Sequence, residues 1–321
     1  MPDIVLIGPG GAKALLELGC LKRLFEEKIN IQPIDIQPID IQSTDIEQKE
    51  PIPFLNNVKT WVGISAGAAI CLLYVIGNSI DEIIDICMEI NLLEDIIAIK
   101  LDEARQKLGL IKNKSIEDKL KQSIQSKLGF IPTLKQLYSL TGLNLSIVTY
   151  NLDKMRPEFL NKESDPDLSC IEAAMMSMAI PILIQPRKYK GCIYVDGALG
   201  APYPVSEFDV ENKKILGIYI SSEEDLFCSD KKPISFLYRL IHSSMKVLRD
   251  NEIKYASKNV KHIPLKTTVR DTTGISLNAE ARQDMIDQGY ECANSFLKFN
   301  SNPEKYDLFL YEDEEIPFSK E

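Results

Sequence analysis

The chain has few histidines, no excess of positive charge and no long apolar run. Its 321 residues include two histidines, and 37 basic side chains stand against 47 acidic ones, which gives a formal net charge of −10. A chain this acidic is not expected to have the positively charged surface that binds nucleic acid, so we expect no nucleic-acid partner. Two histidines, without any CxxC or HxxxH pairing, also argue against a histidine-based metal cage, and we expect no metal site.

The lack of long apolar runs bears on location. The longest run, from Ala66 to Ile76, falls well short of the roughly 20 residues that cross a bilayer. The N-terminus passes from Met-Pro-Asp directly into the apolar segment Ile4 to Ile7, without the basic and apolar regions of a secretory signal peptide. Seven cysteines, an odd number spread along the chain, are typical of reduced thiols. We therefore expect a cytoplasmic protein.

Short apolar strands alternate with amphipathic segments of helical length. Strands are predicted at residues 4–7, 58–64, 145–150, 192–195 and 215–221 and near His262. Helices are predicted at residues 12–28, 66–76, 79–91, 115–128, 171–178, 234–258 and 279–299, with a short one beginning at Thr133. This alternation predicts an α/β fold in which a mainly parallel central sheet is covered by helices on both faces.

A low-complexity tract occupies about residues 31–53. The pentad Ile-Gln-Pro-Ile-Asp occurs there twice, at residues 31–35 and 36–40, and then decays. Pro33 and Pro38 preclude a helix, and the repeat is too brief for a solenoid. Because no other linker is visible, we interpret the chain as a single domain, residues 1–321, with this tract inserted as a surface loop.

The segment Gly63-Ile64-Ser65-Ala66-Gly67 matches the pattern G-x-S-x-G. An apolar strand enters it and an apolar helix leaves it, which is the arrangement of a nucleophile elbow: a sharp turn that raises the serine hydroxyl above the end of a sheet. The alternative is an ordinary strand-to-helix turn in which Ser65 caps the helix. The context favours Ser65 as a nucleophile.

A glycine-rich loop, Gly8-Pro9-Gly10-Gly11, lies between the first strand and the first helix. Gly10 and Gly11 lack a Cβ, so their amides can face a ligand at a helix N-terminus and serve as an oxyanion hole. The competing interpretation is a dinucleotide or phosphate cradle. It would need a third glycine where Lys13 stands, and the P-loop spacing is absent, so we expect no cofactor.

A serine nucleophile needs a base, and neither histidine is well placed to be one. His242 lies within a helical stretch, and His262 lies between Val260 and Ile263 in a strand-like context. Asp196 ends an apolar strand and is followed by Gly197, so its carboxylate is a candidate, since an aspartate within hydrogen-bond reach can act as a base when desolvated. The alternative for Asp196 is an Asp-Gly turn residue.

Together these motifs resemble the patatin-like phospholipases, which use a serine–aspartate dyad without histidine. The glycine loop, G-x-S-x-G and the Asp-Gly-Ala segment occur here in the order found in that family, and the resemblance extends over about residues 2–205. It includes the helix and proline turn at residues 172–181 and the segment at residues 201–204. The resemblance implies a three-layer α/β/α fold.

By position, the resemblance implies that Ser65 is the nucleophile and that Asp196 is the base. It makes Gly10 and Gly11 the core of the oxyanion hole. The supporting motif residues are Gly8, Lys13, Gly63, Gly67 and Gly197. Three positions depart from the family pattern: Pro9 replaces a loop glycine, Lys13 the usual arginine and Ala14 the usual glycine. Because proline has no N–H, an oxyanion donor at that position is lost.

The resemblance implies a serine acyl hydrolase that cleaves fatty-acyl esters of a phospholipid or lysophospholipid. Two alternatives stay open: another acyl ester or thioester hydrolase or acyltransferase, and a catalytically weak lipid-binding or scaffold protein of the same fold, for which Pro9 is the best evidence. The oligomeric state is not indicated. The frequent Ile, Lys, Asn and Asp hint at an AT-rich, parasitic or viral genome, in which case the compartment would be the host's cytosol.

Peripheral contact with a membrane would have to rest on local surface, because a net charge of −10 gives little long-range attraction to anionic bilayers. Two segments are candidates. The apolar positions from Ile83 to Ile97 fit a lid or a bilayer-facing surface, although core packing explains them better. The basic group Arg187, Lys188 and Lys190 could meet lipid phosphates, or it could simply be solvated.

Overall fold

The computed structural model describes residues 1–29, 52–90, 109–111, 113–210, 212–221, 233–267 and 278–301. Most of the low-complexity tract lies outside this described part, as do the apolar positions Leu93, Ile96 and Ile97. Within the described residues, no helix has the length and apolarity needed to cross a membrane. The six cysteines in this part of the chain are all free thiols.

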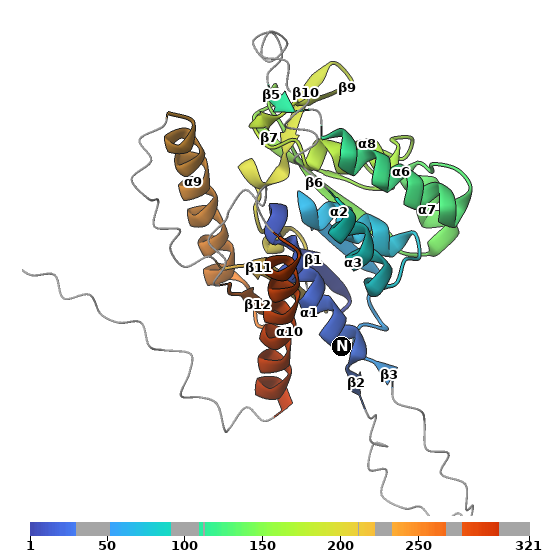
Figure 1. Ribbon diagram of the computed structural model, residues 1–321, viewed down its shortest axis with the longest axis vertical. Coiled ribbons are helices and arrows are strands. Elements are labelled where there is room, and N and C mark those ends of the chain that lie inside the picture. The colour runs from blue at the N-terminus through green and yellow to red at the C-terminus, as the bar shows by residue number, and fades with distance from the viewer. Residues whose placement is uncertain are drawn as a thin grey trace, which may run out of the picture.

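A mostly parallel sheet forms the centre of the molecule (Figure 1). Its strands follow the order β12-β11-β1-β4-β6-β10-β9, and β7 pairs with the other edge of β6. Five strands are parallel to one another, namely β12 (Val260–Leu265), β11 (Ile215–Ile220), β1 (Ile4–Ile7), β4 (Thr60–Ile64) and β6 (Asn144–Asn151). Three are antiparallel to their neighbours: β7 (Arg156–Leu160), β9 (Arg187–Tyr189) and β10 (Cys192–Asp196).

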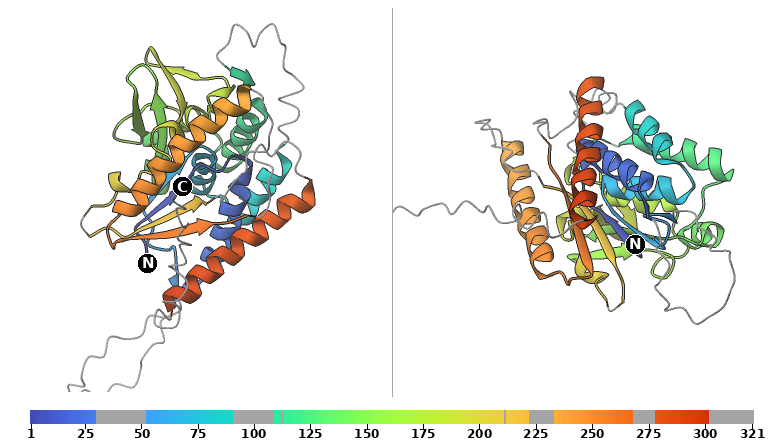
Figure 2. Two further views of the ribbon diagram at one scale, coloured as in Figure 1. Left: turned by 90° about the vertical axis from the view of Figure 1, so that its left-hand side faces the viewer. Right: turned by 90° about the horizontal axis from the view of Figure 1, so that it is seen from below.

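The two faces of the sheet bury different clusters because successive side chains of a strand point to opposite faces. In β1, Val5 and Ile7 belong to the larger cluster, and Ile4 and Leu6 to the smaller one. The helices that pack on the larger cluster are α1 (Ala14–Glu26), α2 (Ala66–Val75), α3 (Ile80–Glu89), α6 (Lys114–Leu128), α7 (Leu134–Thr141), α8 (Cys170–Ser177) and α10 (Ala279–Ser301). On the other face, α9 (Pro233–Tyr255) covers the smaller cluster (Figure 2). This confirms the predicted α/β fold with helices on both faces.

The register of β6 brings two distant parts of the chain together. Val148 of β6 pairs with Ile64, the last residue of β4, and with Phe159 of β7. The next residue, Thr149, pairs with Asp196 of β10 and with Glu158 of β7. Since β7 occupies the other edge of β6 from Ile147 to Asn151, β10 continues along the same edge that β4 leaves. The residue after Ile64 and the side chain of Asp196 are therefore neighbours.

Most predicted elements are present, and the differences have local causes. The predicted helix 12–28 begins as a 3₁₀ turn, Gly11–Lys13, and ends at Glu26, because Glu27 is extended and Lys28 starts β2 (Lys28–Ile29). The sequence did not predict β2, its partner β3 (Ile52–Pro53), β5 (Gly109–Ile111), β8 (Ile182–Ile184), β7 or β9. These strands are too short, or in β7 too polar, to show an alternating pattern. As predicted, His242 lies in α9 and His262 in β12.

Candidate active site

Ser65 occupies the sharp turn between β4 and α2. Its backbone angles are φ 56° and ψ −123°, a conformation that costs a non-glycine residue free energy and that clusters at functional sites. A Cβ on Gly67 would lie 2.5 Å from the carbonyl oxygen of Ile7, and one on Gly63 would lie 2.5 Å from the Cα of Ala68. Both flanking positions of the motif therefore require glycine. The Ser65 side chain makes no capping hydrogen bond to α2, which argues against the helix-cap interpretation.

Ser177 of α8 fixes the backbone of this turn. Its hydroxyl accepts a hydrogen bond from the Ser65 amide at 2.8 Å and donates one to the Val148 carbonyl oxygen at 2.6 Å. The serine turn is thus tied through α8 to β6, the strand that also pairs with β10. Sequence reasoning missed Ser177. The sequence showed only a lone hydroxyl among the apolar residues 173–179, and the structure shows that this hydroxyl is fully buried.

Asp196 is the last residue of β10 and lies next to Ser65, to which its carboxylate is hydrogen-bonded. Its Oδ1 also accepts a hydrogen bond from the Ala198 amide at 2.9 Å. Burial raises the pKa of Asp196 to about 6, against the opposing effect of the hydrogen bonds from Ser65 and Ala198. A Cβ on Gly197 would lie 2.3 Å from the carbonyl oxygen of Val148, so glycine is needed for Asp196 to approach β6 this closely.

The glycine loop lies against the serine turn. The close approach of Gly67 to the backbone oxygens of Ile7 and Gly8 shows this contact directly. The amide of Gly8 donates to the Ile218 carbonyl oxygen at 2.9 Å, and Pro9 has no N–H. Gly10 precedes the 3₁₀ turn, and Gly11, with φ 52°, is exposed. The amides of Gly10 and Gly11 are therefore the loop's candidates for holding an anion, while Lys13 is buried just before α1.

The two histidines lie elsewhere. His262 is on β12, which β11 and β1 separate from β4, and its Nδ1 is hydrogen-bonded to the Tyr203 hydroxyl at 2.8 Å. Burial lowers the pKa of His262, which favours the neutral ring. His242 is on the exposed side of α9. Asp196, and neither histidine, is therefore the side chain that lies beside Ser65.

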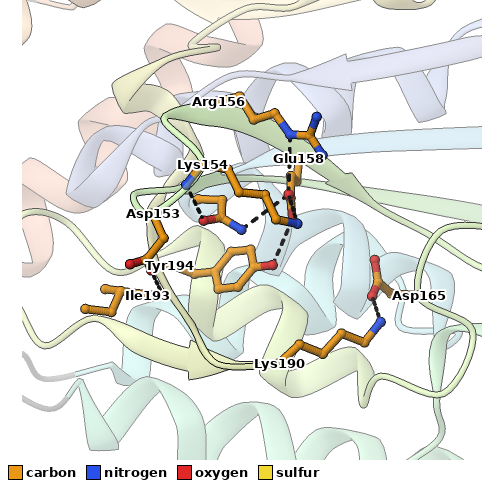
Figure 3. Close-up of polar contacts among 9 residues, drawn as sticks. Asp153, Lys154, Arg156, Glu158, Asp165, Lys190, Ile193 and Tyr194 are labelled. Atoms are coloured by element: carbon orange, nitrogen blue, oxygen red, sulfur yellow. Dashed lines mark hydrogen bonds and ion pairs between the residues drawn. The ribbon is translucent and has the colours of Figure 1, made fainter.

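The strand that carries Asp196 is braced by a polar cluster (Figure 3). The Tyr194 hydroxyl donates to Glu158 of β7 at 2.8 Å, and the Ile193 amide donates to Asp153 in the turn before β7 at 2.6 Å. Lys154 and Arg156 pair with the same glutamate, at 3.0 Å and 3.6 Å. The register that places Asp196 beside Ser65 is thus held by side chains as well as by the backbone.

The basic group suggested for lipid phosphates is largely engaged within the protein. Arg187 pairs with Glu117 at 2.6 Å and with Glu172 at 3.6 Å, and Lys190 pairs with Asp165 at 2.7 Å. Ile83 of α3 is fully buried in the core, in agreement with core packing for that segment. Neither feature supports a surface for lipid. Among the described residues there is also no cluster of three or more metal-ligating side chains.

A comparison with known protein families shows which family the chain belongs to. The model of the patatin-like phospholipases matches residues 5–209, a range that runs from β1 through Asp196. The chain belongs to the patatin-like phospholipase family. That range corresponds closely to residues 2–205, over which the motifs indicated a resemblance. The membership makes the chain one of a family of lipid hydrolases.

Two viral proteins and one bacterial structure are similar to this family member. "Probable lipid hydrolase 463L" of invertebrate iridescent virus 6 is 26% identical over 207 residues, covering 61% of this chain and 70% of that protein. "Uncharacterized protein R571" of Acanthamoeba polyphaga mimivirus is 30% identical over 195 residues, covering 59% of this chain and 64% of that protein, which is less than two thirds of its length. The crystal structure of VipD from Legionella pneumophila matches with a TM-score of 0.53 at 16% identity, covering 92% of this chain and 67% of VipD. The last match shows a shared fold.

Proposed function

We propose that the protein is a serine lipid acyl hydrolase of the phospholipase or lysophospholipase type, acting through a dyad of Ser65 and Asp196. The observation that carries this proposal is the hydrogen bond between a serine in a strained strand-to-helix turn and a buried carboxylate with a raised pKa. A structural serine would not need such a turn, and a structural aspartate in an apolar site would normally be paired with a cation. Perturbed groups of this kind cluster at catalytic sites.

In the first half of the reaction, the Ser65 Oγ attacks the carbonyl carbon of a fatty-acyl ester. Asp196 takes the hydroxyl proton as the new C–O bond forms, and the negative charge moves to the carbonyl oxygen. The amides of Gly10 and Gly11 stabilise that oxyanion at the mouth of the loop. When the tetrahedral intermediate collapses, the bond to the alcohol breaks and Asp196 returns its proton to the leaving oxygen, which leaves an acyl-enzyme.

In the second half, water replaces the alcohol. Asp196 takes a proton from the water as the water oxygen attacks the acyl carbon. Asp196 then passes this proton to the Ser65 Oγ when the fatty acid leaves. A carboxylate with a pKa near 6 is a better base than an ordinary aspartate and is still ionised at neutral pH. The family and the iridescent virus relative, which is named a probable lipid hydrolase, support this substrate class.

The proposal is tested by fatty-acid release from phosphatidylcholine and lysophosphatidylcholine. The wild-type protein releases fatty acid, and the Ser65→Ala and Asp196→Asn proteins lose at least about 1,000-fold in kcat while remaining folded. EDTA leaves the rate unchanged because neither half-reaction uses a metal. If a folded wild-type protein releases no acyl group from any ester or thioester, the chain is a binding or scaffold protein and the loss of a donor at Pro9 is the first explanation to examine.

A further inference from the structure

Between residues 236 and 248, α9 has an apolar side that no described element covers. Five large side chains in this stretch are exposed: Phe236 by 64%, Leu237 by 44%, Leu240 by 50%, Val247 by 59% and Leu248 by 38%. At about 100° per residue they fall within an arc of roughly 120° on the helix. Arg239 and Lys246 lie along one flank of this arc, and Met245, on the opposite side, packs against the core. The helix is therefore amphipathic with its apolar side outward.

The charge of α9 is opposite to that of the chain. Residues 233–249 contain Arg239, Lys246 and Arg249 and no aspartate or glutamate, although the chain has 47 acidic side chains. Asp250, the next residue, pairs with Lys246 at 2.7 Å and with Arg249 at 2.9 Å, and α9 as a whole has four basic and two acidic side chains. An exposed apolar stripe on a helix with net positive charge is the composition of a helix that lies in the interface of an anionic bilayer.

The position of α9 relates this stripe to the active site. The Arg249 guanidinium donates to the carbonyl oxygen of Ile220, the last residue of β11, at 2.9 Å. Because β11, β1 and β4 are parallel and in register, Ile220 lies at the same edge of the sheet as Gly8 and Ser65. The chain after α9 returns to Val260, at the opposite edge. The residues before Arg249 therefore extend beyond the edge that carries the active site, and Figure 1 shows α9 projecting away from the sheet.

A second apolar projection lies at the same edge. β6 is parallel to β4 and continues past it to Asn151, and the turn that follows exposes Leu152 by 40% and Met155 by 79%. Met155 has φ 48°, which turns the chain sharply at this point. Lys154 and Arg156 flank it, with Glu158 as their partner. α9, which carries the first projection, and β6, which leads into the second, both pack against the 3₁₀ turn Gly197–Leu199, which directly follows Asp196.

We propose that these two projections form a docking surface for an anionic lipid bilayer, made of Phe236, Leu237, Leu240, Val247, Leu248, Leu152 and Met155. This inference deepens the proposed function and rests on it, since docking at this edge brings the Ser65 hydroxyl toward the lipid. The apolar side chains enter the boundary between headgroups and acyl chains, and Arg239 and Lys246 face the anionic headgroups. Local positive charge thereby overcomes the repulsion expected from a net charge of −10.

The test measures flotation of the full-length protein with vesicles. Vesicles of phosphatidylcholine alone are compared with vesicles of phosphatidylcholine and phosphatidylglycerol at about 7:3, a ratio that mimics an anionic leaflet. The variants are Phe236→Ser with Leu240→Ser on the docking surface, Leu140→Ser as matched control, and Ser65→Ala. Leu140 is 56% exposed on α7, which leads into the opposite end of β6.

The wild-type, Leu140→Ser and Ser65→Ala proteins are expected to bind the anionic vesicles equally, and to bind neutral vesicles more weakly. The double variant should bind anionic vesicles about 30-fold more weakly, since two exposed apolar side chains lose their burial in lipid. Its thermal unfolding midpoint should match that of the wild type, because both side chains are exposed.

Binding of the double variant at wild-type strength would overturn the docking surface, and so would an equal loss in Leu140→Ser. A wild-type dimer that the double variant dissociates, with no vesicle binding by either protein, would also overturn it in favour of a second copy of the chain. The proposed function fails separately: if the wild type floats with vesicles but hydrolyses no lipid ester, the docking surface stands and the hydrolase does not.

Discussion

The environment of Asp196 determines how it can work as a base. A solvated aspartate holds its proton too weakly to assist a serine at neutral pH, and a histidine normally fills that role. Here burial raises the pKa of the Asp196 carboxyl to about 6, which is close to that of an imidazole. The hydrogen bonds from the Ala198 amide and Ser65 oppose this shift because they stabilise the charged form. In the proposed mechanism, the apolar surroundings of β10 and α8 thus substitute for a catalytic histidine.

This shift predicts the pH dependence of the reaction. Asp196 must be ionised to accept the Ser65 proton, so activity should rise as pH increases through about 6 and then level off, rather than being already complete near pH 5. The measurement is kcat/KM against pH for an ester that does not itself titrate in this range. A profile with its midpoint near 4, or one that does not depend on pH, would contradict the assigned base.

Ser177 is expected to act as a positioning residue for Ser65. Ser177→Ala leaves the Ser65 amide without its buried acceptor, so the turn relaxes and kcat falls by about 10- to 100-fold with little change in KM. Ser146→Ala is the matched control, because Ser146 is equally buried on β6 and its hydroxyl makes no hydrogen bond within the described residues. Equal kinetic effects of the two substitutions would show that Ser177 has only a structural role.

The sequence predicted Ser65 and Asp196 as site residues but not Ser177. Ser65 and Asp196 were recognisable because each carries a local signature: small residues around a sharp turn for Ser65, and an apolar strand ending in Asp-Gly for Asp196. Ser177 has no such signature. Its role depends on α8 lying across the ends of β4 and β6, which is a tertiary contact that no sequence pattern encodes.

At the scale of elements, α1 buries a carboxyl group that the proposed chemistry does not use. Glu17 is fully buried, its two carboxyl oxygens have no hydrogen-bond partner within the described residues, and burial raises its pKa well above the ordinary value. The thiols of Cys20 and Cys71 lie close enough to be affected by it. The native helix therefore favours the protonated form of Glu17.

The contribution of Glu17 to the stability of the protein should consequently fall as pH rises. When the pKa of a carboxyl group is higher in the native state than in the unfolded state, the contribution of that group to stability is complete at pH values below its unfolded-state pKa. This contribution is lost progressively as the group ionises at higher pH. Glu17→Gln removes this loss, so its free energy of unfolding should exceed that of the wild type by more at about pH 8 than at about pH 5. Urea unfolding at both pH values measures the difference.

The control for this prediction is Glu207→Gln, at an exposed position of the 3₁₀ turn Val205–Glu207. It should leave the pH dependence of the wild type unchanged. If Glu17→Gln shows the same dependence as Glu207→Gln, the Glu17 carboxyl is not the group that couples folding to pH.

At the scale of the whole molecule, the active site depends on pairings between distant segments. Asp196 reaches Ser65 because β10 pairs antiparallel with the end of β6, on the edge that β4 has left. Alternating strands and helices were enough to predict the layers and the parallel part of the sheet. They predicted β10 as a strand but not that it runs antiparallel to β6. They did not predict β9 or β7, since these strands of three and five residues carry charged positions and show no clear period.

The low-complexity tract should be dispensable for the reaction. Its described ends, β2 and β3, pair Lys28 with Pro53 and Ile29 with Ile52, so the chain leaves and re-enters the fold at adjacent points. These points lie beyond the far end of α1, which runs for 13 residues away from the glycine loop (Figure 1). A replacement of residues 31–50 by a turn of about four residues should close this hairpin without strain.

The shortened protein should keep the wild-type kcat and KM on a soluble ester, and its unfolding midpoint should not fall. Fatty-acid release and thermal unfolding are the measurements. A loss of activity in a shortened protein that still folds would show that the tract contributes to the active site, against its interpretation as an inserted surface loop.

Covalent labelling determines whether Ser65 is a nucleophile that Asp196 activates. The protein is incubated with a fluorophosphonate at neutral pH, and the modified residue is located by peptide mass spectrometry. The dyad predicts one adduct, on Ser65, that forms far more slowly in Asp196→Asn and is absent in Ser65→Ala. An adduct on another residue, or labelling of Ser65 that does not depend on Asp196, would contradict it.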